Sequence, residues 1–453
     1  MRLTALGLTV AALMAIPVAA QAESPRDDID WTASGCPTGL DCGTLELPVD
    51  WARPHGETFR LALARRPAVP GARRIGVLVV VPGGPGDSGV DHVSRFRDPA
   101  LDGFDIVGFD ARGIKRSSPV VCSADVLARR PATPVDQPGF DRLVAYNREL
   151  HDDCVRHTGP IADHVDTGSV VRDLEAVRRA LGEPKISLFG HSYGTLLGLA
   201  YAERHGDRLR ALALTGLFDH SQDTGGFLRT SAVAVEDAFH QFVRWCDTTP
   251  SCALHGRDVV AAWDDLLARA DRGEVPGQTA ESLSIAAHRS FYGPDHQTLA
   301  NLIAGAPARS ATTTPYPFQA IFCDDFRVKI RDYAEFSRYA DQQRRLAPHM
   351  RGALRQFGAV TSCIGWSDRV SFPQHLLTPH RGTPPILLMN SRHDPAGLYS
   401  WAREVERQAR GRATLVTYEG PGHNVYPKTS CTTTTMHRYL VDLTVPTTTS
   451  CPA

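Results

Sequence analysis

Residues 186–204 read ISLFGHSYGTLLGLAYAER. The apolar run Ile186 to Phe189 is typical of a buried strand, and the residues from Thr195 to Arg204 are typical of a helix. Gly-His-Ser-Tyr-Gly between them is the pattern G-x-S-x-G, which predicts a tight turn that raises Ser192 above the sheet. Glycines suit both sides of the serine, because its backbone is strained and strand and helix approach closely. We therefore predict that Ser192 is a nucleophile at a helix N-terminus, where negative charge is favoured.

A serine hydroxyl needs a histidine base and an acid that orients the histidine. When the nucleophile lies on such a turn, the chain order is serine, then Asp or Glu, then histidine. Asp394 follows the predicted strand 386–389, and His423 follows the predicted strand 413–418 between glycine and asparagine. The sequence therefore predicts a triad of Ser192, Asp394 and His423.

Two other residues compete for these roles. Asp219 follows the predicted strand 209–214 and is the alternative acid. His393 is the alternative base, although it adjoins Asp394 and would reverse the chain order. His423 could also be an ordinary surface histidine, since the chain has 18 of them.

The reaction of a serine nucleophile also needs amide donors for the oxyanion, each worth about 3–4 kcal/mol. The backbone amide of Tyr193, directly after the nucleophile, is one expected donor. The second should come from the loop 82–89, PGGPGDSG, where we choose Gly84 with Gly83 as the reserve. The loop lacks the patterns G-x-x-x-x-G-K-[ST] and G-x-G-x-x-G, so it does not favour nucleotide binding.

Short apolar strands alternate with helical stretches, which indicates an α/β fold with a mostly parallel sheet. The predicted strands are 59–64, 75–81, 104–109, 186–189, 209–214, 386–389 and 413–418. The roughly 170 residues between the fifth and sixth of these are mostly helical in pattern. We predict a core formed by residues 23–218 and 385–453 with an inserted helical lid at 219–384. Two sequential domains fit less well, because the strand pattern resumes after the gap.

The net charge of the chain does not favour binding to a strongly charged partner such as a nucleic acid or an anionic membrane. The 453 residues contain 49 Lys+Arg and 50 Asp+Glu, a formal net charge of −1. We therefore expect no nucleic-acid partner, and the partner has to be inferred from sites. No segment after the N-terminus is apolar for long enough to cross a membrane, so we expect no membrane span in the mature chain. We also expect a monomer.

The N-terminus predicts export. Arg2, an apolar run from Leu3 to Ala19 and the small-residue site Ala20-Gln21-Ala22 form a signal-peptide pattern over residues 1–22. The alternative is a membrane anchor, for which the apolar run is at the short limit. We expect cleavage near Ala22 and a secreted protein.

Export makes the ten cysteines candidates for disulfides. Pairing neighbours along the chain gives Cys36 with Cys42, Cys122 with Cys154, Cys246 with Cys252, Cys323 with Cys363, and Cys431 with Cys451. Sequence alone does not prove this connectivity. The chain has no C-x-x-C pair and no cysteine–histidine cluster at zinc spacing, so we expect no metal and no cofactor.

Three motifs together resemble a known family: the loop Gly83-Gly84-Pro85-Gly86, the segment 110–113 (DARG) with 117–119 (SSP), and the turn around Ser192. They are similar to those of the secreted tripeptidyl aminopeptidases of actinomycetes, relatives of proline iminopeptidase in the α/β-hydrolase superfamily. Pro82 stands where proline iminopeptidases have a histidine, and the usual second glycine after Gly113 is missing. The resemblance implies an α/β-hydrolase core and a secreted serine exopeptidase that releases short peptides, typically tripeptides, from a free N-terminus.

An exopeptidase of this kind needs carboxylates that bind the substrate's ammonium group. The candidates are Asp324, Asp325 and Glu236, with Asp237 beside the last. Glu236 and Asp237 lie in a helical pattern and also fit solvated charges, whereas a Cys323–Cys363 bridge would fix the two adjacent aspartates. Those two aspartates are too few ligands to predict a calcium site.

Two other functions stay open. The same triad suits an esterase or amidase acting on small acyl substrates, and an inactive binding protein can share the scaffold.

Overall fold

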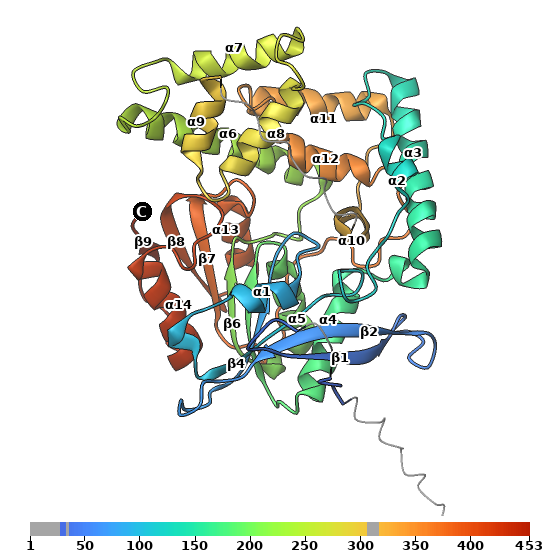
Figure 1. The fold of residues 1–453 in the computed structure, drawn as a ribbon, viewed down its shortest axis with the longest axis vertical. Coiled ribbons are helices and arrows are strands. Elements are labelled where there is room, and N and C mark those ends of the chain that lie inside the picture. Colours follow the sequence, from blue (N-terminus) through green and yellow to red (C-terminus); the bar gives the residue numbers. More distant parts are fainter. Residues whose placement is uncertain (1–27, 33–35, 306–316) are drawn as a thin grey trace, which may run out of the picture.

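A computed structural model describes residues 28–32, 36–305 and 317–453. The predicted signal peptide, residues 1–22, lies outside the described residues. The described chain contains a nine-stranded sheet with the order β1-β2-β4-β3-β5-β6-β7-β8-β9 (Figure 1). Its strands are β1 Asp41–Pro48, β2 Thr58–Arg66, β3 Gly76–Val81, β4 Phe104–Phe109, β5 Ile186–His191, β6 Leu209–Thr215, β7 Ile386–His393, β8 Ala413–Pro421 and β9 Ser450–Cys451.

The sheet is parallel from β4 through β9 and antiparallel where β2 pairs with β1 and with β4. All seven strands predicted from the sequence are present. The sequence did not reveal β1 and β9, which lie at the two edges of the sheet. β1 has the mixed sequence DCGTLELP, and β9 has two residues, so neither forms an apolar run.

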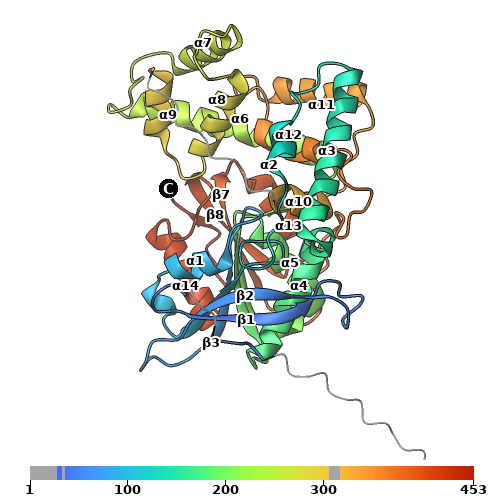
Figure 2. The ribbon, with the colours of Figure 1, turned by 45° about the vertical axis from the view of Figure 1, so that its right-hand side comes forward.

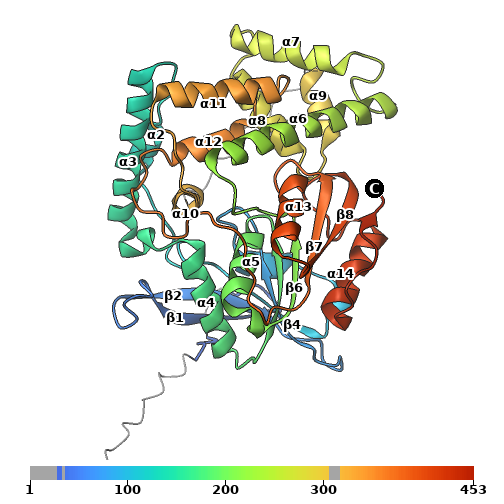
Figure 3. The same cartoon turned by 180° about the vertical axis from the view of Figure 1, so that it is seen from behind.

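Helices cover both faces of the sheet. α1 (Gly89–Arg95) and α14 (Ser430–Asp442) pack on one face, and α4 (Thr167–Ala180), α5 (Gly194–His205) and α13 (Tyr399–Gln408) lie over the other (Figures 1 and 3). The side chains of β3 alternate between the two cores: Val79 packs on the α4 and α5 side, whereas Leu78 and Val80 pack on the α14 side. Strands buried on both faces read as continuous apolar runs, which is why this part of the sheet was predictable.

Between β6 and β7 the chain forms a helical lid above the carboxyl ends of the parallel strands (Figures 1 and 2). The lid helices are α6 Thr224–Thr248, α7 Val259–Asp271, α8 Ala280–Ser290, α9 His296–Ile303, α10 Pro317–Asp325, α11 Tyr333–Leu346 and α12 Leu354–Ser362. α6 to α9 enclose an apolar core of their own, which includes Phe239, Phe242 and Trp263. This part of the lid thus has its own core, whereas α10 to α12 share an apolar cluster with the helices on the sheet, to which Leu196 of α5 and Trp401 of α13 belong.

Two helices from the first part of the chain also join the lid. α2 (Ala124–Ala128) and α3 (Gln137–Thr158) lie beside α11 and α12 in Figure 2. The Asn147 amide of α3 donates to the carbonyls of Thr361 and Ile364, and the rings of Phe140 and Phe336 are 6.1 Å apart. The helical layer thus extends beyond the inserted segment 219–384. Short 3-10 helices lie at Pro99–Leu101, Pro160–Asp163 and Gly206–Arg208.

The structure contains the five disulfides that pair neighbouring cysteines along the chain. Cys323–Cys363 joins α10 to the end of α12 in the lid, and Cys431–Cys451 joins α14 to β9. These bridges hold the lid and the C-terminal edge of the sheet. Within the described ranges, no helix has the length and apolar character needed to span a membrane.

Candidate active site

Ser192 lies between the end of β5 and the start of α5, with a φ of 56° in the left-handed region. That conformation is uncommon for a residue with a side chain, and the packing around it enforces the turn. A Cβ atom on Gly190 would lie 2.7 Å from the Gly194 carbonyl oxygen, and one on Gly194 would lie 2.4 Å from that of Pro82. Both glycines of the G-x-S-x-G pattern are therefore needed for close packing.

His423 and Asp394 form a buried pair. The Nδ1 atom of His423 is 2.9 Å from each carboxylate oxygen of Asp394, and the two side chains are 6% and 0% exposed. Asp394 Oδ1 also accepts hydrogen bonds from the amides of Ala396 and Gly397, at 2.8 and 2.9 Å. A carboxylate only accepts, so Nδ1 carries the hydrogen and Nε2 is left as an acceptor. This is the tautomer that a general base needs.

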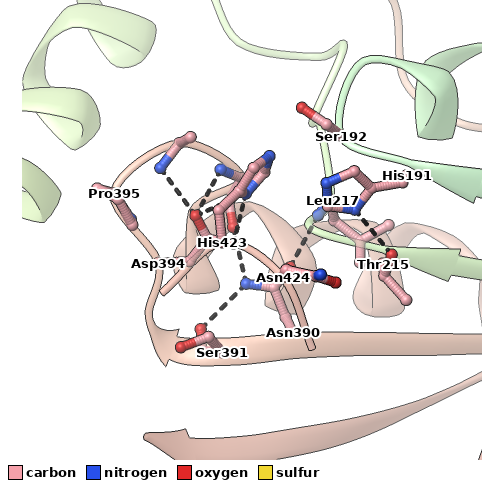
Figure 4. A network of polar contacts seen from close by, with 12 residues as sticks. His191, Ser192, Thr215, Leu217, Asn390, Ser391, Asp394, Pro395, His423 and Asn424 are labelled. Atoms are coloured by element: carbon pink, nitrogen blue, oxygen red, sulfur yellow. Dashed lines mark hydrogen bonds and ion pairs between the residues drawn. The ribbon is translucent and has the colours of Figure 1, made fainter. Parts of the chain in front are cut away.

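The imidazole of His423 is held next to the nucleophile. Figure 4 shows the Ser192 side chain beside the His423–Asp394 pair. The ring of His191, which precedes the serine, lies 4.7 Å from the His423 ring and is itself hydrogen-bonded to Thr215 Oγ1. Nε2 of His423 is buried and has no hydrogen-bond partner among the described residues. The hydrogen bond between a catalytic serine and its histidine often tightens only when substrate is bound.

His191 itself is held neutral. Burial, with the nearby His423 as a second cause, lowers the pKa of His191 well below its usual value. A neutral His191 adds no positive charge beside the general base.

The two competing residues have other partners. His393 Nδ1 is 2.7 Å from Asp237 Oδ2 in α6 and 2.9 Å from Gln241 Nε2. Asp219 accepts hydrogen bonds from the amide and hydroxyl of Ser221. Among the described residues neither side chain forms a hydrogen bond with His423, although His393 directly precedes Asp394 in the chain.

The loop predicted to stabilise the oxyanion packs directly on the nucleophile. A Cβ atom on Gly83 would lie 2.6 Å from Ser192 Cβ and 2.9 Å from its Oγ, so the Gly83–Gly84 peptide lies beside the hydroxyl. No carbonyl of the described backbone accepts a hydrogen bond from the amide of Gly84 or of Tyr193. Free amides next to a nucleophile are the donors that an oxyanion requires.

The lid contacts both catalytic loops. The amide of His423 donates to the Tyr292 carbonyl at 2.7 Å, and the Tyr292 ring lies edge-on to the His423 ring with centroids 5.2 Å apart. His288 of α8 bonds through Nε2 to the Pro395 carbonyl, next to Asp394, at 3.0 Å. Complete burial lowers the pKa of His288 to about 3, so the neutral ring donates this bond. No sequence pattern indicated these contacts, because the residues are more than 100 positions apart.

The predicted ammonium-binding carboxylates have internal roles. Asp325 is fully buried and accepts hydrogen bonds from the Thr167 amide and hydroxyl and from the Tyr193 hydroxyl, at 2.7–2.8 Å. Burial is the main reason that the pKa of Asp325 rises to about 7. Glu236 accepts from the amides of His349 and Met350. Oxygens of Asp325 and Glu236 thus already accept bonds from Thr167, Tyr193 and lid amides, and the structure gives no support for an ammonium site at these two residues.

Asp324 is also buried, and its Oδ2 has no partner among the described residues. Burial, together with the neighbouring charges of Asp166 and Asp325, raises its pKa well above the usual value. A raised pKa favours the neutral form of the carboxyl, and that form is a poor partner for an ammonium group. The structure thus gives no support for an ammonium site at Asp324 either.

The motif at 110–113 is structural. The buried guanidinium of Arg112 forms a two-point pair with Asp173 at 2.7 Å and donates to the carbonyls of Pro48, Val49 and His164. It thereby joins the end of β1 to α4 and to the loop before α4.

An apolar cavity of about 60 Å³ lies beside the loop 82–89. It is lined in part by Gly83, Tyr193 and Ile321, and neither Ser192 nor His423 lines it.

Comparisons with known proteins agree with this geometry. Serine protease Hip1 of Mycobacterium tuberculosis (strain ATCC 25618 / H37Rv) is 29% identical over 459 residues, covering 90% of this chain and 86% of the relative. Tripeptidyl aminopeptidase of Streptomyces lividans is 27% identical over 450 residues, covering 90% and 83%. Carboxylesterase B of the same Mycobacterium tuberculosis strain is 29% identical over 449 residues, covering 89% and 85%.

A family model described as the alpha/beta hydrolase fold matches residues 76–428, which extend from β3 past His423. The match takes in strands β3 to β8, the lid and all three residues of the predicted triad. This chain is a member of the α/β-hydrolase fold family.

Proposed function

We propose that this serine hydrolase is a secreted exopeptidase that releases short peptides, in the first instance tripeptides, from free N-termini. The observation that carries the proposal is the buried Asp394–His423 pair beside the strained Ser192. The names of two relatives, a serine protease and a tripeptidyl aminopeptidase, support peptide substrates.

In the proposed mechanism, Ser192 Oγ attacks the scissile carbonyl carbon while His423 Nε2 takes the hydroxyl proton. Asp394 stabilises the imidazolium through Nδ1–H, and the amides of Tyr193 and Gly84 bind the oxyanion. His423 then gives the proton to the leaving amine, which breaks the carbon–nitrogen bond and leaves an acyl-enzyme. A water molecule, deprotonated by His423, hydrolyses the ester, and the proton returns to Ser192.

Export is part of the proposal. The pattern of residues 1–22 and the five disulfides fit an oxidising compartment outside the cytoplasm. Mass determination of the N-terminus of protein collected from culture medium tests cleavage near Ala22.

Esterase activity is the second candidate, because a relative named carboxylesterase B is as similar as the named protease. A panel of tripeptide and single-residue arylamides, assayed beside short p-nitrophenyl esters, separates the two. We expect tripeptide arylamides to be cleaved with the higher kcat/KM. N-acetylation of the tripeptide should abolish cleavage, since an exopeptidase recognises the free amine.

Ser192→Ala is the control for all of these assays. Ester turnover without any arylamide turnover contradicts the peptidase proposal. A folded wild-type protein that fails to react with a fluorophosphonate at Ser192 contradicts serine hydrolase chemistry and favours an inactive binding protein.

A further inference from the structure

Arg355, on α12 of the lid, is joined to His423 by two ring contacts. Its guanidinium carbon lies 5.1 Å from the centroid of the Tyr292 ring, over that ring. The Tyr292 ring in turn lies 5.2 Å from the His423 ring. The next residue on α12, Gln356, donates to the Pro395 carbonyl at 3.4 Å, so the first turn of this helix reaches the loop of Asp394. A permanent positive charge therefore lies close to the predicted triad.

Within the part of the chain that the structure describes, the Arg355 guanidinium has no anionic partner. Among the described residues it forms no ion pair within 4.0 Å and no side-chain hydrogen bond, although the side chain is half-buried. By contrast, Arg338 of α11, which lies over the Tyr339 ring at 5.7 Å, is paired with Glu335. Arginine carries five fixed N–H donors and stays charged, so a half-buried and unpaired guanidinium is a ready site for a carboxylate.

The chemistry decides which part of a substrate this charge faces. His423 has to give its proton to the leaving nitrogen, so the leaving fragment must lie against the His423 ring. The oxyanion loop, at Gly83 and Gly84, contacts Ser192 and binds the carbonyl oxygen of the acyl part. Tyr292 contacts the His423 ring from the lid and Arg355 lies over Tyr292, so both residues are on the side of His423 that the lid covers.

We propose that Arg355 binds a carboxylate of the leaving peptide and so makes the enzyme selective for substrates whose released C-terminal fragment is anionic near the scissile bond. The carboxylate is either the free C-terminus of a one- or two-residue leaving fragment or an acidic side chain at its first residue. This inference rests on the proposed peptidase function and adds a substrate preference to it. Tyr292 holds the guanidinium in place by a cation–π contact.

The test uses one tripeptide acyl group joined to different leaving groups. The leaving groups are glycine with a free carboxylate and its neutral match glycinamide, and aspartic acid α-amide with a free side-chain carboxylate and its neutral match asparagine amide. A neutral tripeptide arylamide reports the basal peptidase activity. Because a charged hydrogen bond contributes about 10- to 100-fold, we expect each carboxylate substrate that uses Arg355 to exceed its amide by at least tenfold in kcat/KM, mostly through KM.

Arg355→Met should bring that ratio to about one, and Arg355→Lys should restore part of it, since lysine keeps the charge but not the fork of donors. Arg338→Met, which removes the matched cation–π pair on α11, should leave the ratio and the arylamide rate unchanged. Preference for the free glycine assigns the C-terminal carboxylate, and preference for aspartate assigns the side chain.

Arylamide cleavage by the wild type with no carboxylate preference overturns the inference and leaves the proposed function standing. Full carboxylate preference in Arg355→Met also overturns the inference and leaves the proposed function standing. Failure of the folded wild type to cleave the arylamide and every peptide overturns the proposed function, and the inference with it.

Discussion

Replacing Asp394 by asparagine should remove most of the activity while keeping the fold. Asp394 Oδ1 accepts hydrogen bonds from the amides of Ala396 and Gly397. In the Asp394→Asn variant the amide oxygen must stay at that position, because its NH₂ group cannot accept from those amides. The NH₂ group then takes the place of Oδ2, 2.9 Å from His423 Nδ1, where it favours the tautomer in which Nδ1 is an acceptor. The hydrogen of the imidazole moves to Nε2, and the base can no longer take the Ser192 proton.

The expected loss follows from this wrong tautomer. Orienting and charge-stabilising carboxylates of this kind are worth about 10⁴-fold in kcat. At 1.36 kcal/mol for each factor of ten, that is about 5 kcal/mol of transition-state stabilisation. The side chain of Asp394 is 0% exposed, so solvent does not replace the missing charge. KM should change little, because the lost interaction belongs to the transition state.

The assay is tripeptide arylamide hydrolysis, with circular dichroism and thermal unfolding to establish that the variant is folded. Asp237→Asn is the matched control, since Asp237 pairs with the alternative base His393. We expect that variant to stay within about threefold of the wild type, as is usual for a partly exposed pair. A folded Asp394→Asn variant that keeps a tenth of the wild-type kcat, or an equal loss in Asp237→Asn, refutes the reasoning.

Three further predictions follow from the packing. Gly83→Ala would place a methyl group 2.6 Å from Ser192 Cβ and so displace the reacting group. Arylamide kcat/KM should therefore fall at least about 100-fold, while Tm changes little. Retention of full activity would contradict the placement of this loop. Asp325 has a pKa of about 7 in the folded protein and about 3.9 in the unfolded chain. Between these two values the folded state binds the proton more tightly than the unfolded state. The contribution of Asp325 to stability therefore falls as pH rises from about 4 to about 7. Urea unfolding at pH 5 and pH 8 should show the wild type losing about 3 kcal/mol more than Asp325→Asn, and equal losses would disprove the raised pKa. The cysteines of the Cys323–Cys363 bridge have a sequence separation of 40, and a loop of that length restricts the unfolded chain strongly. Replacing both cysteines should lower the free energy of unfolding, measured by urea titration, by about 4 kcal/mol. A change below about 1 kcal/mol would show that the bridge adds little stability.

Local patterns were sufficient for the strained turn at Ser192 and for most of the sheet. The strand, turn and helix around Ser192 lie within 20 consecutive residues, and each glycine is required by contacts with the same short segment or with Pro82. The buried strands read as apolar runs because both of their faces are covered. β1 and β9 lie at the sheet edges and lack that signal.

Pairings between distant segments could not be deduced in this way. The sequence offered six carboxylates and two histidines as candidates, and the fold shows that Asp394 pairs with His423 while Asp237 pairs with His393. Asp325 was predicted to bind substrate, yet burial turns it toward Tyr193. Such outcomes depend on which helix packs over which loop.

The sequence by itself determined the family, the chain order of the predicted triad and the set of cysteines, because each is written in residues that are adjacent or regularly spaced. The tertiary structure decided which charges have partners. It buried Asp325 and Glu236 among internal donors and left the Arg355 guanidinium without an anion near His423. The physical reason is that the free energy of a charge depends on burial and on neighbours within a few ångströms, and residues far apart in the chain supply both.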